Sequence, residues 1–450
     1  MCGIVAAAAR REVSEILLEG LRRLEYRGYD SAGLALFNAG GELCMHKRQG
    51  KVAELERAQQ ELPHNGSTGI AHTRWATHGE PSQENAHPHL SGGRVALVHN
   101  GIIENHAALR EELQAAGYEM ASATDTEVIV HLLHRCLEQG ADLLDAMRDV
   151  IARLEGAYAI AVIDTEHPNE VVGARRGSPL VVGIGIGENF LASDQMALRQ
   201  VTDRFIYLEE GDLVKITPSS LQVFDERGDP VQRERTRISE AVEAADKGDF
   251  DHYMIKEIFE QPHALEATFG GAANARQVED SFGSGAAEIF DRVQNVQIVA
   301  CGTSYHAGMV ARYWLEELAG VACEVEVASE FRYRKRVQHD GTLLVAISQS
   351  GETADTLAAL RNATEGEFIG SLVVANVDNS SLVRECDLVF LTRAGAEIGV
   401  ASTNAFTTQL VGFVMVSLAL GRRGAMEVGR QAVIIAALRR LPTYVQQTLQ

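Results

Sequence analysis

The chain has 450 residues, of which 46% are hydrophobic and 23% charged, proportions typical of folded globular proteins. Its formal net charge of −21 argues against a nucleic-acid partner, because such partners require a basic surface. The six cysteines form no C-x-x-C pair, which indicates a reducing cytoplasm rather than a disulfide framework. The longest apolar stretch, residues 410–420, is too short to cross a bilayer and predicts a buried helix.

Residues up to about 215 combine short strands with helices. β-like runs bounded by Gly, Asn or Asp are predicted at 32–37, 67–72, 94–99, 157–164, 179–185 and 189–194. Helical patterns cover 14–24 and 126–140. Because the strands cluster in sequence, this part predicts a layered sheet sandwich. The glycine-rich run at 183–189 lacks the last glycine of a dinucleotide motif, so we interpret it as strand and turn.

The second half of the chain follows a different pattern. A charged, apolar-poor stretch at 224–252 predicts a linker. Strand-like runs then begin at 295, 322, 342, 371 and 387 and alternate with helices, which predicts an open parallel sheet. We therefore expect a first domain at 2–218, a linker at 219–285, a second domain at 286–425 and a further connection beginning at 426–450.

A cysteine follows the initiator methionine. Removal of Met1 leaves a thiol of pKa about 8.5 beside an α-amine of pKa about 7.7–8.0. The amine then acts as general base, so the Cys2 thiolate attacks an amide carbonyl without a histidine partner. The alternative role for Cys2 is a small buried hydrophobe at the start of a strand.

Two further stretches offer partners for such a nucleophile. Asn100 and Gly101 follow an apolar strand, where a side-chain amide and a backbone N–H stabilise developing negative charge. Asn-Gly is also the strongest short hairpin signal, and taken alone it favours a turn. Arg74, near Thr77 and His78, suits a substrate carboxylate, although the same composition is typical of a solvated surface loop.

Asp125 is the candidate for the other charge of an amino acid. The spacing of Thr124 and Glu127 predicts a capping box for the next helix, which is the structural interpretation of this stretch. Functionally, Asp125 pairs with a ligand ammonium while Arg74 holds the carboxylate. With Cys2 at the amide, this combination describes glutamine.

Three stretches of the second half carry hydroxyl groups where a strand end precedes a helix start. The hydroxyl residues are Thr303, Ser304, Ser348, Ser350, Thr353 and Ser402, and Gln349 lies among them on the second stretch. Hydroxyls beside unpaired helix N–H groups form a phosphate cradle without lysine or arginine, at the edge where open α/β sheets bind ligands. Each stretch alone is also typical of an ordinary serine N-cap.

Longer motifs carry a resemblance to a known family. "MCGIV", "LEYRGYDSAG", "HTRWATHGEP", "VHNGIIEN" and "TDTE" resemble the glutaminase domain of class II amidotransferases. With "HYMIKEIFEQP", "ACGTSY", "ASEFRYR", "ISQSGETADT" and "EIGVAST", the whole chain resembles the glutamine–fructose-6-phosphate aminotransferase family. The resemblance implies an α+β N-terminal-nucleophile hydrolase sandwich (αββα), followed by an α/β sugar isomerase (SIS) domain with a parallel, flavodoxin-like sheet.

The resemblance also assigns roles to individual residues. It implies Cys2 as nucleophile, Asn100 and Gly101 as the oxyanion hole, and Trp75 as the gate of an ammonia channel. Glutamine binding is implied for Arg74, Thr77, His78 and Asp125. Sugar-phosphate binding is implied for Thr303, Ser304, Ser348, Gln349, Ser350, Thr353 and Ser402.

The implied reaction moves the amide nitrogen of glutamine to fructose 6-phosphate and gives glucosamine 6-phosphate and glutamate. The resemblance implies a cytoplasmic homodimer, formed through the SIS domain, that needs no metal or organic cofactor. The histidines at 72, 78, 87, 89 and 99 lack a matching acidic cluster and predict no metal site.

The chain departs from the family pattern in three respects. Ala6 stands where the family usually has glycine, and Asn404 stands where it usually has lysine beside the sugar site. The family also carries a second SIS domain of about 150 residues, which we expect this chain to lack together with its isomerising groups. The alternatives to amino-sugar synthesis are therefore a stand-alone glutaminase and a sugar-phosphate-binding regulatory module.

Overall fold

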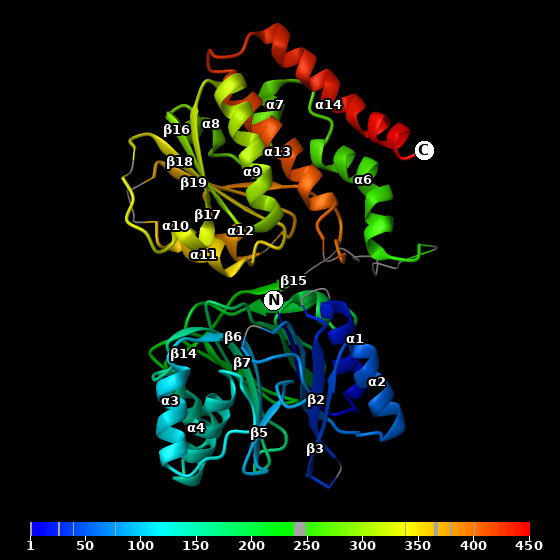
Figure 1. The fold of residues 1–450 in the computed structure, drawn as a ribbon, viewed down its shortest axis with the longest axis vertical. Helices are drawn as coiled ribbons and strands as arrows, with labels where there is room; N and C mark the ends of the chain where they lie inside the picture. Colours follow the sequence, from blue (N-terminus) through cyan, green and yellow to red (C-terminus); the bar gives the residue numbers. More distant parts are fainter. Residues whose placement is uncertain are drawn as a thin grey trace. The chain divides into compact units, whose positions relative to one another are not determined.

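A computed structural model describes residues 2–25, 28–38, 40–76, 78–237, 248, 250–337, 339–363, 368–378, 380–399 and 401–450. The chain divides into two compact units, residues 1–241 and residues 242–450 (Figure 1). Each unit has its own sheets and its own hydrophobic core, as independent domains do.

Two antiparallel sheets form the first unit. The eight-stranded sheet has the order β15-β11-β9-β10-β1-β4-β2-β3. Its strands are β1 (Gly3–Ala9), β2 (Ser31–Phe37), β3 (Leu43–Gln49), β4 (Thr68–Arg74), β9 (Val181–Ile184), β10 (Glu188–Ala192), β11 (Arg204–Tyr207) and β15 (Arg235–Arg237). The hairpin of β9 and β10 confirms the strand and turn predicted for the glycine-rich run.

The seven-stranded sheet has the order β14-β13-β12-β8-β7-β6-β5. Its strands are β5 (His89–Ser91), β6 (Val95–Ile103), β7 (Gly156–Asp164), β8 (Val171–Arg176), β12 (Leu213–Ile216), β13 (Leu221–Phe224) and β14 (Pro230–Val231). The two sheets pack face to face through a fully buried cluster that includes Ile4, Ala6, Val98 and Ala161. Ala6 is therefore part of the core between the sheets, where its small side chain fits.

Helices cover the outer face of each sheet. α1 (Ser14–Leu24) and α2 (Val52–Glu61) pack on the eight-stranded sheet, and α1 matches the helix predicted at 14–24. The outer face of the seven-stranded sheet carries α3 (His106–Ala115), α4 (Glu127–Glu138) and α5 (Leu143–Ile151) (Figure 1). The layer order helix, sheet, sheet, helix confirms the predicted αββα sandwich.

The second unit contains one parallel sheet. Its strands are β16 (Asn295–Ala300), β17 (Ala322–Val327), β18 (Thr342–Ser348), β19 (Gly370–Ala375) and β20 (Leu388–Leu391), in the order β17-β16-β18-β19-β20. This is the flavodoxin-like order, which confirms the predicted fold. β18 is buried along its whole length, as a central strand covered on both faces requires.

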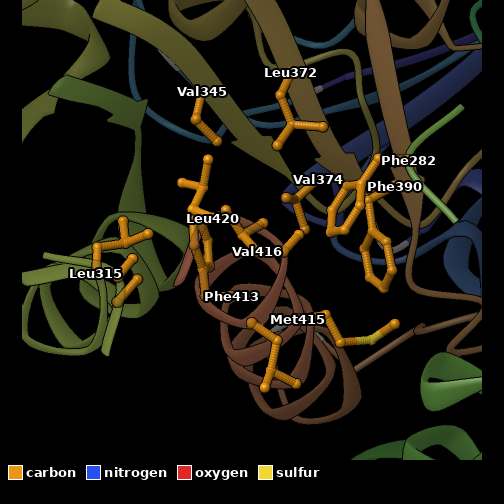
Figure 2. Close-up of a cluster of buried hydrophobic side chains, with 14 of the residues drawn as sticks. Phe282, Leu315, Val345, Leu372, Val374, Phe390, Phe413, Met415, Val416 and Leu420 are labelled. Atoms are coloured by element: carbon orange, nitrogen blue, oxygen red, sulfur yellow. The ribbon is translucent and has the colours of Figure 1, made fainter. Parts of the chain in front are cut away.

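Helices lie on both faces of this parallel sheet. Those that pack most closely on its strands are α9 (Gly302–Trp314), α10 (Ala328–Phe331), α11 (Ala354–Arg361), α12 (Ser381–Glu385) and α13 (Asn404–Gly421). Of the other helices, α6 (Tyr253–Phe269) and α7 (Ala275–Asp280) pack on α13, α8 (Ala286–Phe290) packs on α7, and α14 (Val428–Thr448) packs on α6. In Figure 2, Phe413, Val416 and Leu420 of α13 pack beside side chains of the sheet. Among the described residues α13 alone is long and apolar enough to cross a membrane, but 78% of it is buried in this core.

The segment at 219–285, expected to be a linker, contains regular structure. β13 pairs with β12 inside the first unit, and α6 buries Leu265 and Phe269 in the core of the second unit. The high charge of the stretch hid these elements, and two of its carboxylates, Glu257 and Glu279, are themselves buried. The domain boundaries themselves stay predictions.

Candidate active site

Cys2 lies directly before β1, in the middle of the eight-stranded sheet. β1 pairs with β4, with Gly3 opposite Thr73, and this pairing brings the backbone of Trp75 beside Cys2. The Trp75 amide donates a hydrogen bond to Cys2 Sγ at 3.2 Å. Burial raises the pKa of the Cys2 thiol, so the thiol is protonated at neutral pH and needs a base before it can attack.

Asn100 and Gly101 lie inside β6, opposite Ala159 and Tyr158 of β7. The turn that Asn-Gly favours when taken alone is therefore wrong, because strand pairing with β7 overrides the local preference. Gly101 has φ +140°, and a Cβ atom there would lie 1.9 Å from the Ala157 carbonyl oxygen. Only glycine fits at this position. Asn100 Nδ2 donates a hydrogen bond to the Cys2 carbonyl oxygen at 3.0 Å.

His72, on β4, contacts the Asn100 amide from the other side. Its Nε2 lies 3.0 Å from Asn100 Oδ1 and 3.1 Å from the His99 carbonyl oxygen. Because both partners accept, the Nε2 atom carries the proton. Burial lowers the pKa of His72 to about 3, so the ring stays neutral. His72 reaches Asn100 only because β4 and β6 lie close together, so this contact could not be predicted from the residues around His72.

Arg74 ends β4 and is only 4% exposed. Its guanidinium donates to the His78 carbonyl, to the Gly79 carbonyl at 3.2 Å and to the Glu80 carbonyl at 3.4 Å. Arg74 thus shapes the loop that follows it. Thr77, predicted to bind glutamine, lies outside the described residues.

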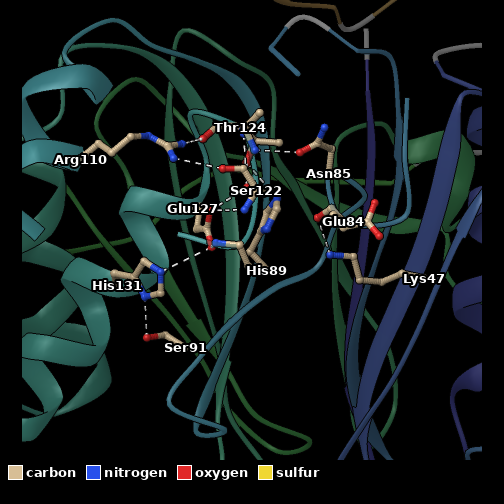
Figure 3. A network of polar contacts seen from close by, with 12 residues as sticks. Lys47, Glu84, Asn85, His89, Ser91, Arg110, Ser122, Thr124, Glu127 and His131 are labelled. Atoms are coloured by element: carbon tan, nitrogen blue, oxygen red, sulfur yellow. Dashed lines mark hydrogen bonds and ion pairs between the residues drawn. The ribbon is translucent and has the colours of Figure 1, made fainter. Parts of the chain in front are cut away.

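Asp125 lies in the loop before α4 and is 4% exposed. Its Oδ2 accepts a hydrogen bond from the Ile103 amide at 2.8 Å, which ties the loop to the end of β6. The predicted capping box is wrong. Thr124 Oγ1 lies 3.1 Å from His89 Nε2, and the Glu127 carboxylate accepts from the amides at 121 and 122 (Figure 3).

The carboxylate of Glu127 is the centre of this buried network. Burial alone would raise the pKa of Glu127, but the nearby His131 ring, with Nε2 3.6 Å from Oε1, and hydrogen bonds from Ala121 and Ser122 outweigh burial and lower the pKa to about 2. Arg110 donates to the carbonyls of Ser122 and Thr124 at 3.1 and 2.6 Å. The loop that carries Asp125 is therefore held from both sides.

A small pocket in the first unit opens beside Cys2 and the loop that carries Asp125. Its lining includes the predicted residues Cys2, Arg74, Trp75, His78, Gly101 and Asp125, together with His87, His99, Thr124 and Thr126. The pocket therefore brings a thiol, a cation and a carboxylate together around one space.

The predicted phosphate loops follow neighbouring strands of the second unit. β16 and β18 are parallel, so residues 302–304 and 348–353 lie at the same edge of the sheet. Ser348 Oγ lies 2.8 Å from Thr353 Oγ1 and accepts from the Gly351 amide at 3.0 Å, while Ser350 Oγ accepts from the Glu352 amide at 3.1 Å.

Two further hydroxyl candidates, Ser304 and Ser402, contact residues on or before α13. Gln409 Nε2 donates to Ser304 Oγ at 3.0 Å, and Ser402 Oγ lies 3.4 Å from Glu397 Oε2. Asn404, the first residue of α13, is fully buried, and neither of its amide atoms has a partner among the described residues.

Comparisons with known proteins match both units. Residues 72–200 match the family model of a glutamine amidotransferase domain, and residues 289–419 match that of a SIS domain. A relative from Pseudomonas putida, named glutamine–fructose-6-phosphate aminotransferase (isomerizing), is 60% identical over all of this chain and 74% of its own length. The relative of that name from Escherichia coli K12 is 54% identical with the same coverage.

A solved structure is also similar in sequence. The C-terminal domain of glucosamine-fructose-6-phosphate aminotransferase from Francisella tularensis is 48% identical, over 44% of this chain and 56% of that chain, with a TM-score of 0.43.

The fold and the matched models define a glutamine amidotransferase domain joined to a sugar isomerase domain. Sequence identity above 50% to these relatives over the whole of this chain then shows the family. The chain belongs to the glutamine–fructose-6-phosphate aminotransferases (isomerizing), which confirms the resemblance.

Proposed function

We propose that the chain releases ammonia from glutamine at Cys2 and uses it to convert fructose 6-phosphate into glucosamine 6-phosphate. The observation that carries the proposal is the pocket that joins Cys2 to Arg74 and Asp125. The wider assignment is supported by family membership and by the hydroxyl-rich loops of the second unit.

The first half-reaction begins with removal of Met1, which frees the α-amine of Cys2. The amine takes the thiol proton, and the thiolate attacks the amide carbon of glutamine. The Asn100 side chain and the Gly101 amide stabilise the resulting oxyanion. The C–N bond then breaks, the α-ammonium returns its proton to the leaving nitrogen, and ammonia departs. Water hydrolyses the thioester and releases glutamate.

Two charged residues select the amino-acid end of glutamine. The Arg74 guanidinium pairs with the substrate carboxylate, and the Asp125 carboxylate pairs with the substrate ammonium. His78, which lines the pocket, and Thr77, which lies outside the described residues, are also proposed to bind glutamine. Trp75, a residue that is 41% exposed, is proposed to gate the path of ammonia.

The second half-reaction requires a sugar-phosphate site. Hydroxyl groups of Ser348, Ser350 and Thr353, with Thr303 and Ser304 at the neighbouring strand end, are proposed to bind the phosphate together with N–H groups of helix starts. Gln349 and Ser402 are proposed to contact the sugar. A homodimer formed through the SIS domain and a cytoplasmic location stay predictions.

An assay with glutamine and fructose 6-phosphate tests the proposal. Glutamate and glucosamine 6-phosphate in equal amounts support it. Glutamate alone supports a stand-alone glutaminase, and saturable sugar-phosphate binding without glutamate release supports a regulatory module. The Cys2→Ala variant is the control, because it must lose glutamate release and keep sugar-phosphate binding.

A further inference from the structure

We propose that Asn85 is a positioning residue that sets the separation between the two groups binding the charged end of glutamine. This inference rests on the proposed function of the first unit. Asn85 lies between β4 and β5 and is 5% exposed. Its Nδ2 donates to the Glu80 carbonyl oxygen at 2.9 Å, and its Oδ1 accepts from the Ala123 amide at 2.8 Å.

Each of these two bonds reaches one half of the glutamine site. The Glu80 carbonyl also lies 3.4 Å from Arg74 Nη1, so Asn85 and Arg74 share one acceptor. Ala123 is two residues before Asp125 in the loop that Asp125 ties to β6. One buried amide side chain therefore joins the loop of the proposed carboxylate ligand to the loop of the proposed ammonium ligand. Figure 3 shows Asn85 beside the second of these loops, near Ser122 and Thr124.

Packing leaves little freedom at this junction. Gly79 has φ +76°, and a Cβ atom there would lie 2.8 Å from Asn85 Nδ2 and 3.2 Å from Ala123 Cβ. The two loops thus meet at Asn85 with no space for a further methyl group. A change at Asn85 alters the spacing of the loops directly.

The loop after β4 also has anchors that do not involve Asn85. From β3, Lys47 Nζ donates to the Glu84 carbonyl at 3.0 Å, and Gln49 Nε2 donates to the Pro81 carbonyl at 2.9 Å. Loss of the Asn85 side chain therefore leaves this loop attached to the eight-stranded sheet. What is lost is the fixed distance between the loop and Asp125.

The hydrolysis rate of a substrate depends on the distance between this loop and Asp125 only when the substrate carries both a carboxylate and an α-ammonium group. Glutamine does, whereas glutaramate, which lacks the α-amino group, uses the carboxylate site alone. We expect Asn85→Ala to lower kcat/KM for glutamine about tenfold more than for glutaramate, mainly through KM. Gln49→Ala is the matched control, because it removes a loop anchor outside the Arg74–Asp125 connection and should leave this selectivity unchanged.

Glutamate and glutarate release by the intact chain provide the readout. Unchanged selectivity in a folded Asn85→Ala variant overturns the proposal, and so does an equal loss of selectivity in Gln49→Ala. If Asn85→Ala does not fold, the selectivity of the isosteric Asn85→Asp variant is measured instead. That variant keeps the acceptor for the Ala123 amide and loses the donor to the Glu80 carbonyl, so unchanged selectivity again overturns the proposal. Absence of glutamine hydrolysis in the unaltered chain instead refutes the proposed function.

Discussion

The ring of His72 holds the side-chain amide of Asn100 so that its nitrogen faces Cys2. The Nε2–H group of His72 donates to Asn100 Oδ1 at 3.0 Å, and Asn100 Nδ2 donates to the Cys2 carbonyl at 3.0 Å. Because burial lowers the pKa of His72 to about 3, the ring is in this neutral donor form at neutral pH. The orientation of the proposed oxyanion-hole amide is therefore built into three strands of the sandwich.

Removal of this support should slow the chemical step. We expect His72→Ala to lower kcat for glutamate release about tenfold, with KM nearly unchanged, because the Asn100 amide becomes free to turn. Asn100→Ala should lower kcat by about 10²–10³. Equal activity of His72→Ala and the unaltered chain, alongside a slow Asn100→Ala, would show that His72 has no such role.

Gly101 should tolerate no side chain. In Gly101→Ala the new methyl group meets the Ala157 carbonyl, so β6 must move and the proposed oxyanion amide moves with it. We expect glutamate release to fall at least 100-fold. Gly93→Ala is the control, since Gly93 also has a positive φ (+69°) but open space around it. That variant should cost about 1 kcal/mol of stability and keep its activity.

The carboxylate of Glu127 should make stability depend on pH in acid. The pKa of Glu127 is about 2 in the folded chain, below its ordinary value of 4.5, so the stabilisation is complete above pH 4.5 and disappears as pH falls toward 2. We expect Glu127→Gln to destabilise the first unit by about 1–2 kcal/mol at pH 6, after allowance for solvent screening. Calorimetry of the intact chain should show this difference shrinking below pH 4.5. A difference that stays constant down to pH 3 contradicts the assignment.

Sugar-phosphate binding should depend on the loop after β18. We expect Ser348→Ala to weaken binding of fructose 6-phosphate about tenfold in calorimetric titration, without altering glutamate release. Ser371→Ala is the control, because Ser371 lies at the opposite end of the neighbouring strand β19. Its Oγ donates a hydrogen bond to Asp387 Oδ2 at 2.8 Å. Equal weakening by Ser371→Ala would mean that the loop after β18 is not the binding site.

Local patterns predicted most of the fold. The apolar periodicity of 14–24 defined α1, and the alternation of strands and helices after residue 290 predicted the parallel sheet. The flavodoxin-like order of that sheet was implied only by the family resemblance. The strands and helices at 219–285 were missed because their short apolar runs are interrupted by charges. Segments of this kind gain their stability from tertiary pairing, which composition does not reveal.

The candidate site was predictable where the chemistry of a residue is unusual. Cys2, Arg74 and Asp125 carry functional groups that stand out in sequence, and the structure places all three around one pocket. Asn100-Gly101 favoured a turn because hairpin preferences ignore a distant partner strand. Asn85 acts on a loop 38 residues away, so its role becomes visible only in three dimensions.

The central claim is that the Cys2 thiol, activated by its own freed α-amine, attacks the glutamine amide. To test it, active protein is treated with a glutamine analogue that carries an electrophile in place of the amide. The labelled protein is then analysed by intact-mass and peptide mass spectrometry. We predict one label per chain, on Cys2, in protein from which Met1 has been removed. Full activity with Met1 still attached, or a label on any other residue, would contradict the account.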